Sequence, residues 1–457
     1  MNSTDNYIIE KVVVEVQTTN METANYVKNN ISSFLQENVF PQLEVLLDDY
    51  KNSDKTMRID SLLLNIVPAV GFNLDDIGAK IIHQFSLELN KKVELSRMEE
   101  GNEFTTNGVD VLSIQQKQKE MFLFFLENGY LPWSGKKEDI VMLVQFDSWL
   151  KALDDTVFTS TLFTLLNQNK IAFDRFLVQF TPEVIFSFLF SASSDKSFPA
   201  TTKQLADSIK RVISNRNKER IIEFHDKLIG FLQKNNLFLV DVKRELLEVT
   251  AEAFEKGLET SYLKKSTSGV IDSLSEKDSK QFEDEPFFET RKNEIAIQNA
   301  GLILLHPFLK RFFEKLGILD EKGGIKKSDL QVAVQSLHYM ATGTEEFFEA
   351  NLVFEKFLCG VSLKMPIERD SLLTDMIKDE SQLLLTEVVK HWPALKNTSP
   401  EGLRQLFIQR NGKLVQEKSN YKLIIERKAQ DILLDQLNWN ISIIKLPWRK
   451  ELITVEW

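Results

Sequence analysis

Two short stretches of alternating apolar and polar positions lie in the first hundred residues, and a helical pattern follows each of them. Residues 8–16 predict a strand with three valines on one face and two charged side chains on the other (Val12, Val14 and Val16 against Lys11 and Glu15). Residues 57–66 predict a second strand, and apolar residues at three- and four-residue steps predict helices over 21–37 and 74–94. This order predicts a small α/β module at residues 1–97, with an open sheet able to pair with another chain.

The rest of the chain divides by composition and periodicity. A polar, glycine-containing stretch predicts a linker at 98–113, and a series of short helical patterns predicts a helical domain at 114–262. Residues 263–292 are rich in serine, lysine and acids and predict a flexible linker. Residues 293–457 predict a C-terminal domain that is helical first and ends in short strands. The fold class we expect is therefore α+β and predominantly helical, with its small β-rich part at the end.

Composition and charge limit the kinds of partner that the chain is expected to bind. The net charge of −11, without a basic stripe, argues against nucleic acid and against an anionic membrane surface. The longest apolar run, 184–192, is far shorter than the roughly 20 residues that span a bilayer. The first residues lack the basic and apolar regions of a signal peptide, and Cys359 is the single cysteine. We therefore expect a cytoplasmic protein without membrane insertion or an internal disulfide.

Candidate catalytic chemistry is sparse. The histidines do not stand at metal-ligand spacing on one helix (His83, His225, His306, His338 and His391). The sequence contains no phosphate-binding glycine motif and no nucleophile elbow. Cys359 ends an apolar helical pattern, where the negative end of the helix dipole disfavours a thiolate, so we expect it to be buried. We predict a protein that is not an enzyme, without a catalytic residue, cofactor or metal.

Tryptophan-containing motifs are the best candidates for a binding site. Leu-Pro-Trp occurs twice, and two further tryptophans lie near the second copy (Leu131, Pro132 and Trp133; Leu446, Pro447 and Trp448; Trp439 and Trp457). One interpretation is that they pack inside the fold, because an indole is large, apolar and needs a partner for its N–H. The other is that they anchor a protein partner, since tryptophan is enriched at binding hot spots. The sequence leaves both open.

Three stretches together resemble the family of contractile injection system tape measure proteins, which belong to phage-tail-like particles. The first stretch is Ile9 to Val16 with Arg58 to Leu62, and the second is Phe124 to Trp133. The third covers most of the predicted C-terminal domain, the last block of the chain (Asn299 to Leu309, Ala341-Thr-Gly, Leu358-Cys-Gly, His391 to Ser399, Glu401-Gly-Leu-Arg, Leu446-Pro-Trp and Val455-Glu-Trp). Residues 140–290 carry no such motif.

The resemblance implies a non-enzymatic structural or assembly component that controls tube length or initiates the tube at the baseplate. Its implied partners are tube, baseplate, spike or cap subunits of the same particle. A fully helical chain of this length would reach about 690 Å at about 1.5 Å per residue, but prolines and strands forbid one continuous helix. A cap or adaptor component therefore stays open, as does a cytosolic chaperone-like helical scaffold for cargo or tube subunits. Within the last block we expect Trp439 and Trp448 to be packed, and the margin near Trp457 to be the contact surface.

Overall fold

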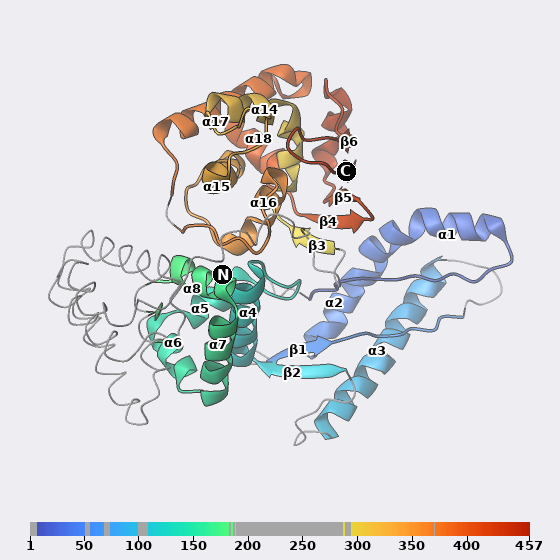
Figure 1. Cartoon of the computed structure of the whole chain (residues 1–457). Coiled ribbons are helices and arrows are strands. Elements are labelled where there is room, and N and C mark those ends of the chain that lie inside the picture. Colours follow the sequence, from blue (N-terminus) through green and yellow to red (C-terminus); the bar gives the residue numbers. More distant parts are fainter. Residues whose placement is uncertain are drawn as a thin grey trace, which may run out of the picture. The chain divides into compact units, whose positions relative to one another are not determined.

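The structure is a computed structural model that forms two compact units, an N-terminal unit (residues 1–120) and a C-terminal unit (residues 121–457). It describes residues 7–50, 55–67, 74–98, 108–181, 184, 185, 188, 287, 294–369 and 371–457 (Figure 1). The helices predicted between 189 and 262 and nearly all of the predicted linker at 263–292 lie outside these residues.

The N-terminal unit is mainly helical. Its elements are α1 (Met21–Phe34), a π-helical turn η1 (Leu35–Val39), α2 (Phe40–Asp48), β1 (Lys55–Ile59), α3 (Leu74–Met98), β2 (Val109–Ser113) and the start of α4 (Ile114–Asn128). The Asn20 side chain accepts a hydrogen bond from the backbone of Glu22 and so caps α1. Pro41 lies in the first turn of α2, where its missing N–H costs little. The chain therefore passes through Pro41 with a π-helical turn rather than a break.

A small apolar core joins α3 to the first two helices. It contains Phe34, Leu35, Val39, Leu43 and Leu74. Gly78 on α3 permits the Phe34 ring of α1 to approach the α3 backbone closely, because a β-carbon built at Gly78 would lie 2.9 Å from the tip of that ring. The unit is thus held together by helix packing, and its two strands form a ribbon beside it.

The strand predicted at 8–16 is wrong: these residues have no regular secondary structure, and six of their apolar side chains are between 41% and 70% exposed. The second strand is shorter than predicted and pairs antiparallel with β2, which falls inside the predicted 98–113 linker. Alternation predicts a pleated conformation but does not specify a partner, so the sequence pattern chose the wrong segment.

The helical section of the C-terminal unit has an aromatic core. Its described helices, within residues 121–188, are the remainder of α4, α5 (Lys137–Leu143), α6 (Phe146–Leu153), α7 (Thr156–Gln168) and α8 (Lys170–Gln179). Trp149 is fully buried, lies 5.2 Å from Phe122 between ring centroids and donates its indole N–H to the carbonyl of Val184 at 3.0 Å. Phenylalanines make up much of this core, among them Phe122, Phe125, Phe158 and Phe176.

The last block (residues 294–457) is α+β, which confirms the predicted fold class. Five strands lie in the order β3 (Glu294–Ile297), β4 (Gly412–Glu417), β5 (Asn420–Ile425), β7 (Ile453–Glu456) and β6 (Ile443–Ile444), with only the β5–β7 pair parallel. The α-helices are α14 (His306–Lys315), α15 (Leu330–Thr342), α16 (Val353–Cys359), α17 (Asp375–His391) and α18 (Pro400–Leu403). Shorter turns complete it: 3₁₀ turns at Ala300–Leu305, Lys327–Asp329, Glu349–Asn351, Pro393–Leu395 and Ala429–Gln436 (η8), and a π-helical turn at Arg404–Ile408.

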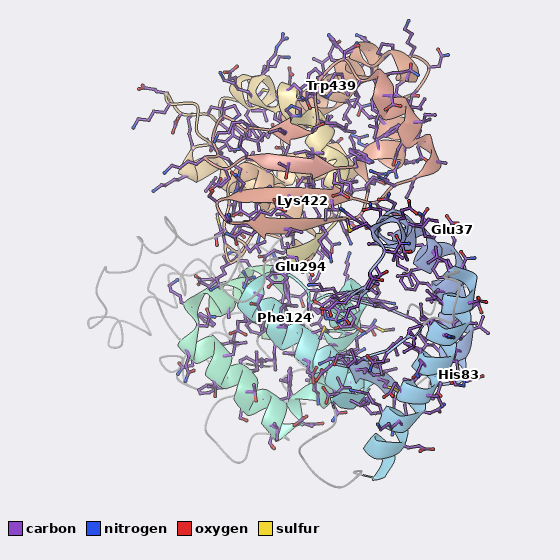
Figure 2. The ribbon with its side chains drawn as sticks, turned by 90° about the vertical axis from the view of Figure 1, so that its right-hand side faces the viewer. Glu37, His83, Phe124, Glu294, Lys422 and Trp439 are labelled. Atoms are coloured by element: carbon purple, nitrogen blue, oxygen red, sulfur yellow. The ribbon has the colours of Figure 1, made fainter. Side chains whose placement is uncertain are left out.

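The sheet of the last block has an apolar and a charged face. Leu414, Leu423 and Ile453 are fully buried in the main core, together with side chains from the helices of the block. The other face carries ion pairs between neighbouring strands, such as Lys422 with Glu456 at 2.7 Å. Figure 2 shows the strands side by side, with Lys422 on a central strand. The helices therefore occupy one face of the sheet and leave the other to charged side chains.

Candidate partner-binding site

The chain end folds back onto the core of the last block through two tryptophans. The indole N–H of Trp439 donates to the carbonyl of Leu304 at 3.0 Å, and that of Trp448 donates to the carbonyl of Leu358 at 2.7 Å. The ring of Trp439 packs against Phe308, and that of Trp448 packs against Phe313. Each indole N–H thus bonds to a backbone carbonyl far away in the sequence, 135 residues for Trp439 and 90 for Trp448. The two rings therefore fix the terminal segment to the core.

The last residue is held differently. Trp457 is partly buried, and its indole N–H donates to a carboxylate oxygen of Asp431 at 3.1 Å. The other oxygen of Asp431 accepts from the buried guanidinium of Arg410 at 2.7 Å. Asp431 therefore links the chain end to the interior of the block. All three tryptophans pack against the core of the block, but the indole N–H of Trp457 bonds to a side-chain carboxylate, whereas those of Trp439 and Trp448 bond to backbone carbonyls.

The two Leu-Pro-Trp copies adopt different turns. In the first, Gly135 donates its backbone N–H to the carbonyl of Pro132, so the proline opens the turn. In the second, Arg449 donates to the carbonyl of Leu446, so the proline is the second residue, the position that its fixed φ favours. Leu446 is buried and Pro447 is exposed, while Leu131, Pro132 and Trp133 are all half-buried. The copies are equal in sequence but not in local structure, and they lie in different parts of the C-terminal unit.

Arg449, which follows the second copy, makes a buried contact with two aromatic rings that the sequence does not predict. Its guanidinium carbon lies 4.1 Å from the ring centroid of Phe357 and 5.3 Å from that of Tyr421. One terminal nitrogen donates to the carbonyl of Phe357 at 2.6 Å. A guanidinium over aromatic faces stabilises a buried contact through the ring quadrupole. The only sequence signal was its position directly after Leu-Pro-Trp, where the first copy has Ser134.

A terminal margin stays accessible beside these anchors. We give this name to Ile432, Ile443 and Trp457, which lie on or next to η8, β6 and β7. Ile432 is 72% exposed and Ile443 is 61% exposed. Ile443 belongs to β6, which is an edge strand of the sheet. Exposed apolar side chains on an edge strand are a feature of protein-binding surfaces.

A buried charge cluster connects the helical section to the last block. Glu349 accepts from Arg175 at 3.1 Å and from Lys356 at 2.7 Å through one carboxylate oxygen, and all three side chains are at most 1% exposed. Arg175 also donates to the carbonyls of Leu126 and Lys364. Together these groups carry two positive charges and one negative charge in the interior. Carbonyl oxygens therefore supply the rest of the compensation that buried cations need.

Lys356 makes the contribution of this cluster to the free energy of unfolding depend on pH. Burial lowers its pKa from 10.5 to about 8, although Glu349 partly opposes the shift. Between pH 8 and 10.5 the unfolded chain binds more protons than the folded one, so this lysine makes stability rise with pH. The unfolding free energy of wild type minus that of Lys356→Met should increase by on the order of 3 kcal/mol over this range. Denaturant titrations of both proteins measure it, and a difference that stays flat with pH would contradict the shift.

The potential nucleophile is buried. Cys359 is 3% exposed, and burial raises the pKa of its thiol well above the usual value, with Glu355 adding to the effect. The predicted burial is therefore confirmed, and the thiol stays protonated at neutral pH. Among the described residues, no group of three or more His, Cys, Asp or Glu could hold a metal ion. Every helix in the same part of the chain is too short or too polar to span a bilayer.

The comparison with protein families decides the identity. A profile of the family described as "Contractile injection system tape measure protein" matches residues 6–457. The chain belongs to this family. The match runs through the helical section and the segment between 140 and 290, where the sequence motifs were absent. No curated protein and no solved structure gives a match to the chain. The tape measure family consists of structural components of injection particles, so the chain has a structural or assembly role.

Proposed function

We propose that this tape measure family member acts as a non-enzymatic docking component when the tube is initiated at the baseplate. The observation that carries this proposal is the terminal segment, whose tryptophans are fixed to a compact α+β block. A preorganised surface binds a partner with a smaller entropy cost than a disordered tail. A rigid block of this kind therefore suits attachment to a defined site on another subunit.

The lengths of the described helices also favour docking over measurement of length. The longest described helix is α3, with 25 residues, and at about 1.5 Å per residue it extends about 38 Å. The last block is built from shorter helices and a sheet, so it cannot extend without unfolding. A ruler must transmit its length along the tube axis, and a compact block does not do so. This supports initiation rather than tube length control for residues 294–457.

The terminal margin, which includes Trp457, is the surface we assign to the partner. Among the predicted site residues, Trp439, Leu446 and Trp448 face the core of their own block through the contacts above. Pro447 is exposed beside them, and Leu131, Pro132 and Trp133 lie in the helical section. The partners we propose are tube, baseplate, spike or cap subunits of the particle, met in the cytoplasm during assembly.

Affinity purification of the tagged chain from cells that assemble the particle tests this proposal. We expect the wild-type protein to recover tube or baseplate subunits, and Trp457→Ala to fold but lose most of them. Met376→Ala is the matched control, because Met376 is exposed on α17 of the same block and outside the margin. Recovery of no particle subunit by the wild-type chain would contradict the docking role. Equal recovery of particle subunits by wild type and Trp457→Ala would show that the terminal margin is not part of the docking surface.

A further inference from the structure

Residues 8–17 form a segment that is anchored at both ends and forms no backbone pairing with the described part of the chain between them. At one end the hydroxyl of Tyr7 donates to a carboxylate oxygen of Asp48 at 2.6 Å. At the other end Asn20 caps α1, and its own backbone N–H donates to the hydroxyl of Thr18. Figure 1 shows the segment running without helical turns toward the start of α1. No backbone hydrogen bond joins residues 8–17 to any other described residue.

An anchored stretch of this kind exposes a row of backbone donors and acceptors, as an edge strand does. Its side chains are those of a strand, since Val12, Val14 and Val16 share one face and Val13 lies on the other. Val13 is 70% exposed and the other three are 45–48% exposed. The exposed backbone and valines therefore can pair with another strand, and the described part of this chain does not supply one.

The charges of the segment specify which strand fits. In an antiparallel pair of two identical segments centred on Val13, Lys11 of one copy lies directly opposite Glu15 of the other, and the reverse holds across the two-fold axis. The same register places Val12 opposite Val14 twice. A shift by one residue, with Val12 opposite Val13, places Glu10 opposite Glu15 instead, and a parallel in-register pair places each charge beside its own copy. Like charges directly opposite are destabilising, so the register centred on Val13, with its two attractive pairs, is favoured over these two.

We propose that residues 8–18 pair antiparallel with the same residues of a second copy of this chain, about a two-fold axis at Val13. The occupant of this edge is a second copy because the segment is complementary to itself in both charge and apolar pattern. The interface is isologous and belongs to the N-terminal unit, so it is independent of the proposed docking role of the last block. It makes the chain a dimer before it meets other particle subunits.

Charge exchange tests the register in the full-length protein. Sedimentation velocity over a concentration series at low salt should show a dimer for wild type. Lys11→Glu and Glu15→Lys should each raise the dissociation constant about ten- to a hundredfold, because each change replaces two attractive pairs by two repulsive ones. The double variant Lys11→Glu/Glu15→Lys restores opposite charges and should dimerise like wild type. Lys28→Glu, an exposed charge reversal on α1, is the control and should have no effect.

Cysteine cross-linking tests the axis independently. Val13→Cys places a thiol opposite its own copy, where β-carbons of paired residues lie about 5 Å apart. Val16→Cys places it opposite Glu10, away from its copy. Because Cys359 is buried, oxidation with diamide should give a covalent dimer of Val13→Cys and little of Val16→Cys. A wild-type chain that stays monomeric at every concentration would overturn the proposal. So would a double charge variant as weak as the single ones, or equal cross-linking of the two cysteine variants.

Discussion

Replacing Glu349 with alanine is expected to lower the free energy of unfolding of the C-terminal unit by about 3–5 kcal/mol. Glu349 is fully buried and is the carboxylate that Arg175 and Lys356 share. Its removal leaves the side chains of Arg175 and Lys356 in the interior without their shared carboxylate, with backbone carbonyls as their remaining partners. Denaturant unfolding followed by tryptophan fluorescence measures the loss. Glu401→Ala is the matched control, because Glu401 pairs with Arg404 at 3.2 Å but is 53% exposed, and it should cost under about 1 kcal/mol.

A double-mutant cycle separates charge from packing in this cluster. Glu349→Gln keeps the shape of the side chain and removes the charge that Lys356 faces. Adding Lys356→Met removes the lysine that has lost this partner. The double variant should therefore be more stable than the sum of the two single changes predicts, with a coupling of at least about 1 kcal/mol. Strict additivity of the two changes would contradict a direct interaction between Glu349 and Lys356.

Replacing Gly301 with alanine is expected to destabilise the last block by about 3 kcal/mol or more. Gly301 lies in the 3₁₀ turn Ala300–Leu305, whose six residues are all buried. A β-carbon there would lie 1.8 Å from the carbonyl oxygen of Phe407 and 2.7 Å from the α-carbon of Ile408. Both contacts are backbone, so no side-chain rotation can relieve them. The protein should lose cooperative unfolding of this block or shift its midpoint strongly downward in a denaturant titration.

Gly317→Ala supplies the comparison for this effect. Gly317 has φ +69°, and a β-carbon added to it would meet no atom within 4 Å, so alanine there adds backbone strain without a clash. We expect a cost of about 1–2 kcal/mol from the left-handed conformation alone. If Gly301→Ala cost no more than Gly317→Ala, the close approach between the 3₁₀ turn and the π-helical turn Arg404–Ile408 would be contradicted.

The sequence predicted those features that depend on local periodicity. The helix that ends at Cys359, its following Gly360 in the left-handed conformation and the buried thiol all follow from one apolar pattern and one glycine. The α+β class of the last block also follows from local patterns, since most of its strands lie close together along the chain. Local propensity and tertiary packing agree at these positions, so a pattern suffices.

Features that depend on distant partners could not be predicted in the same way. The cluster of Arg175, Glu349 and Lys356 joins residues far apart in the sequence. Arg175 and Glu349 are 174 positions apart, and each of the three alone resembles an ordinary charged helix residue. Its one local signal is Lys356 within an otherwise apolar helix. The sequence pattern predicts a linker where β2 lies, because the pairing of β2 with β1 spans a long helix. The same limit applies to residues 8–16, whose pattern predicts a strand without indicating a partner within the chain.

Tube lengths in assembled particles test the central claim, that the chain docks at initiation rather than measuring the tube. The variants insert or delete helical residues between 264 and 292, and electron microscopy of purified particles gives the length distribution. A docking component predicts the same mean length for every variant, with particle number falling only when docking fails. A shift of the mean by about 1.5 Å per inserted or deleted residue, about 45 Å for roughly thirty residues, would contradict it.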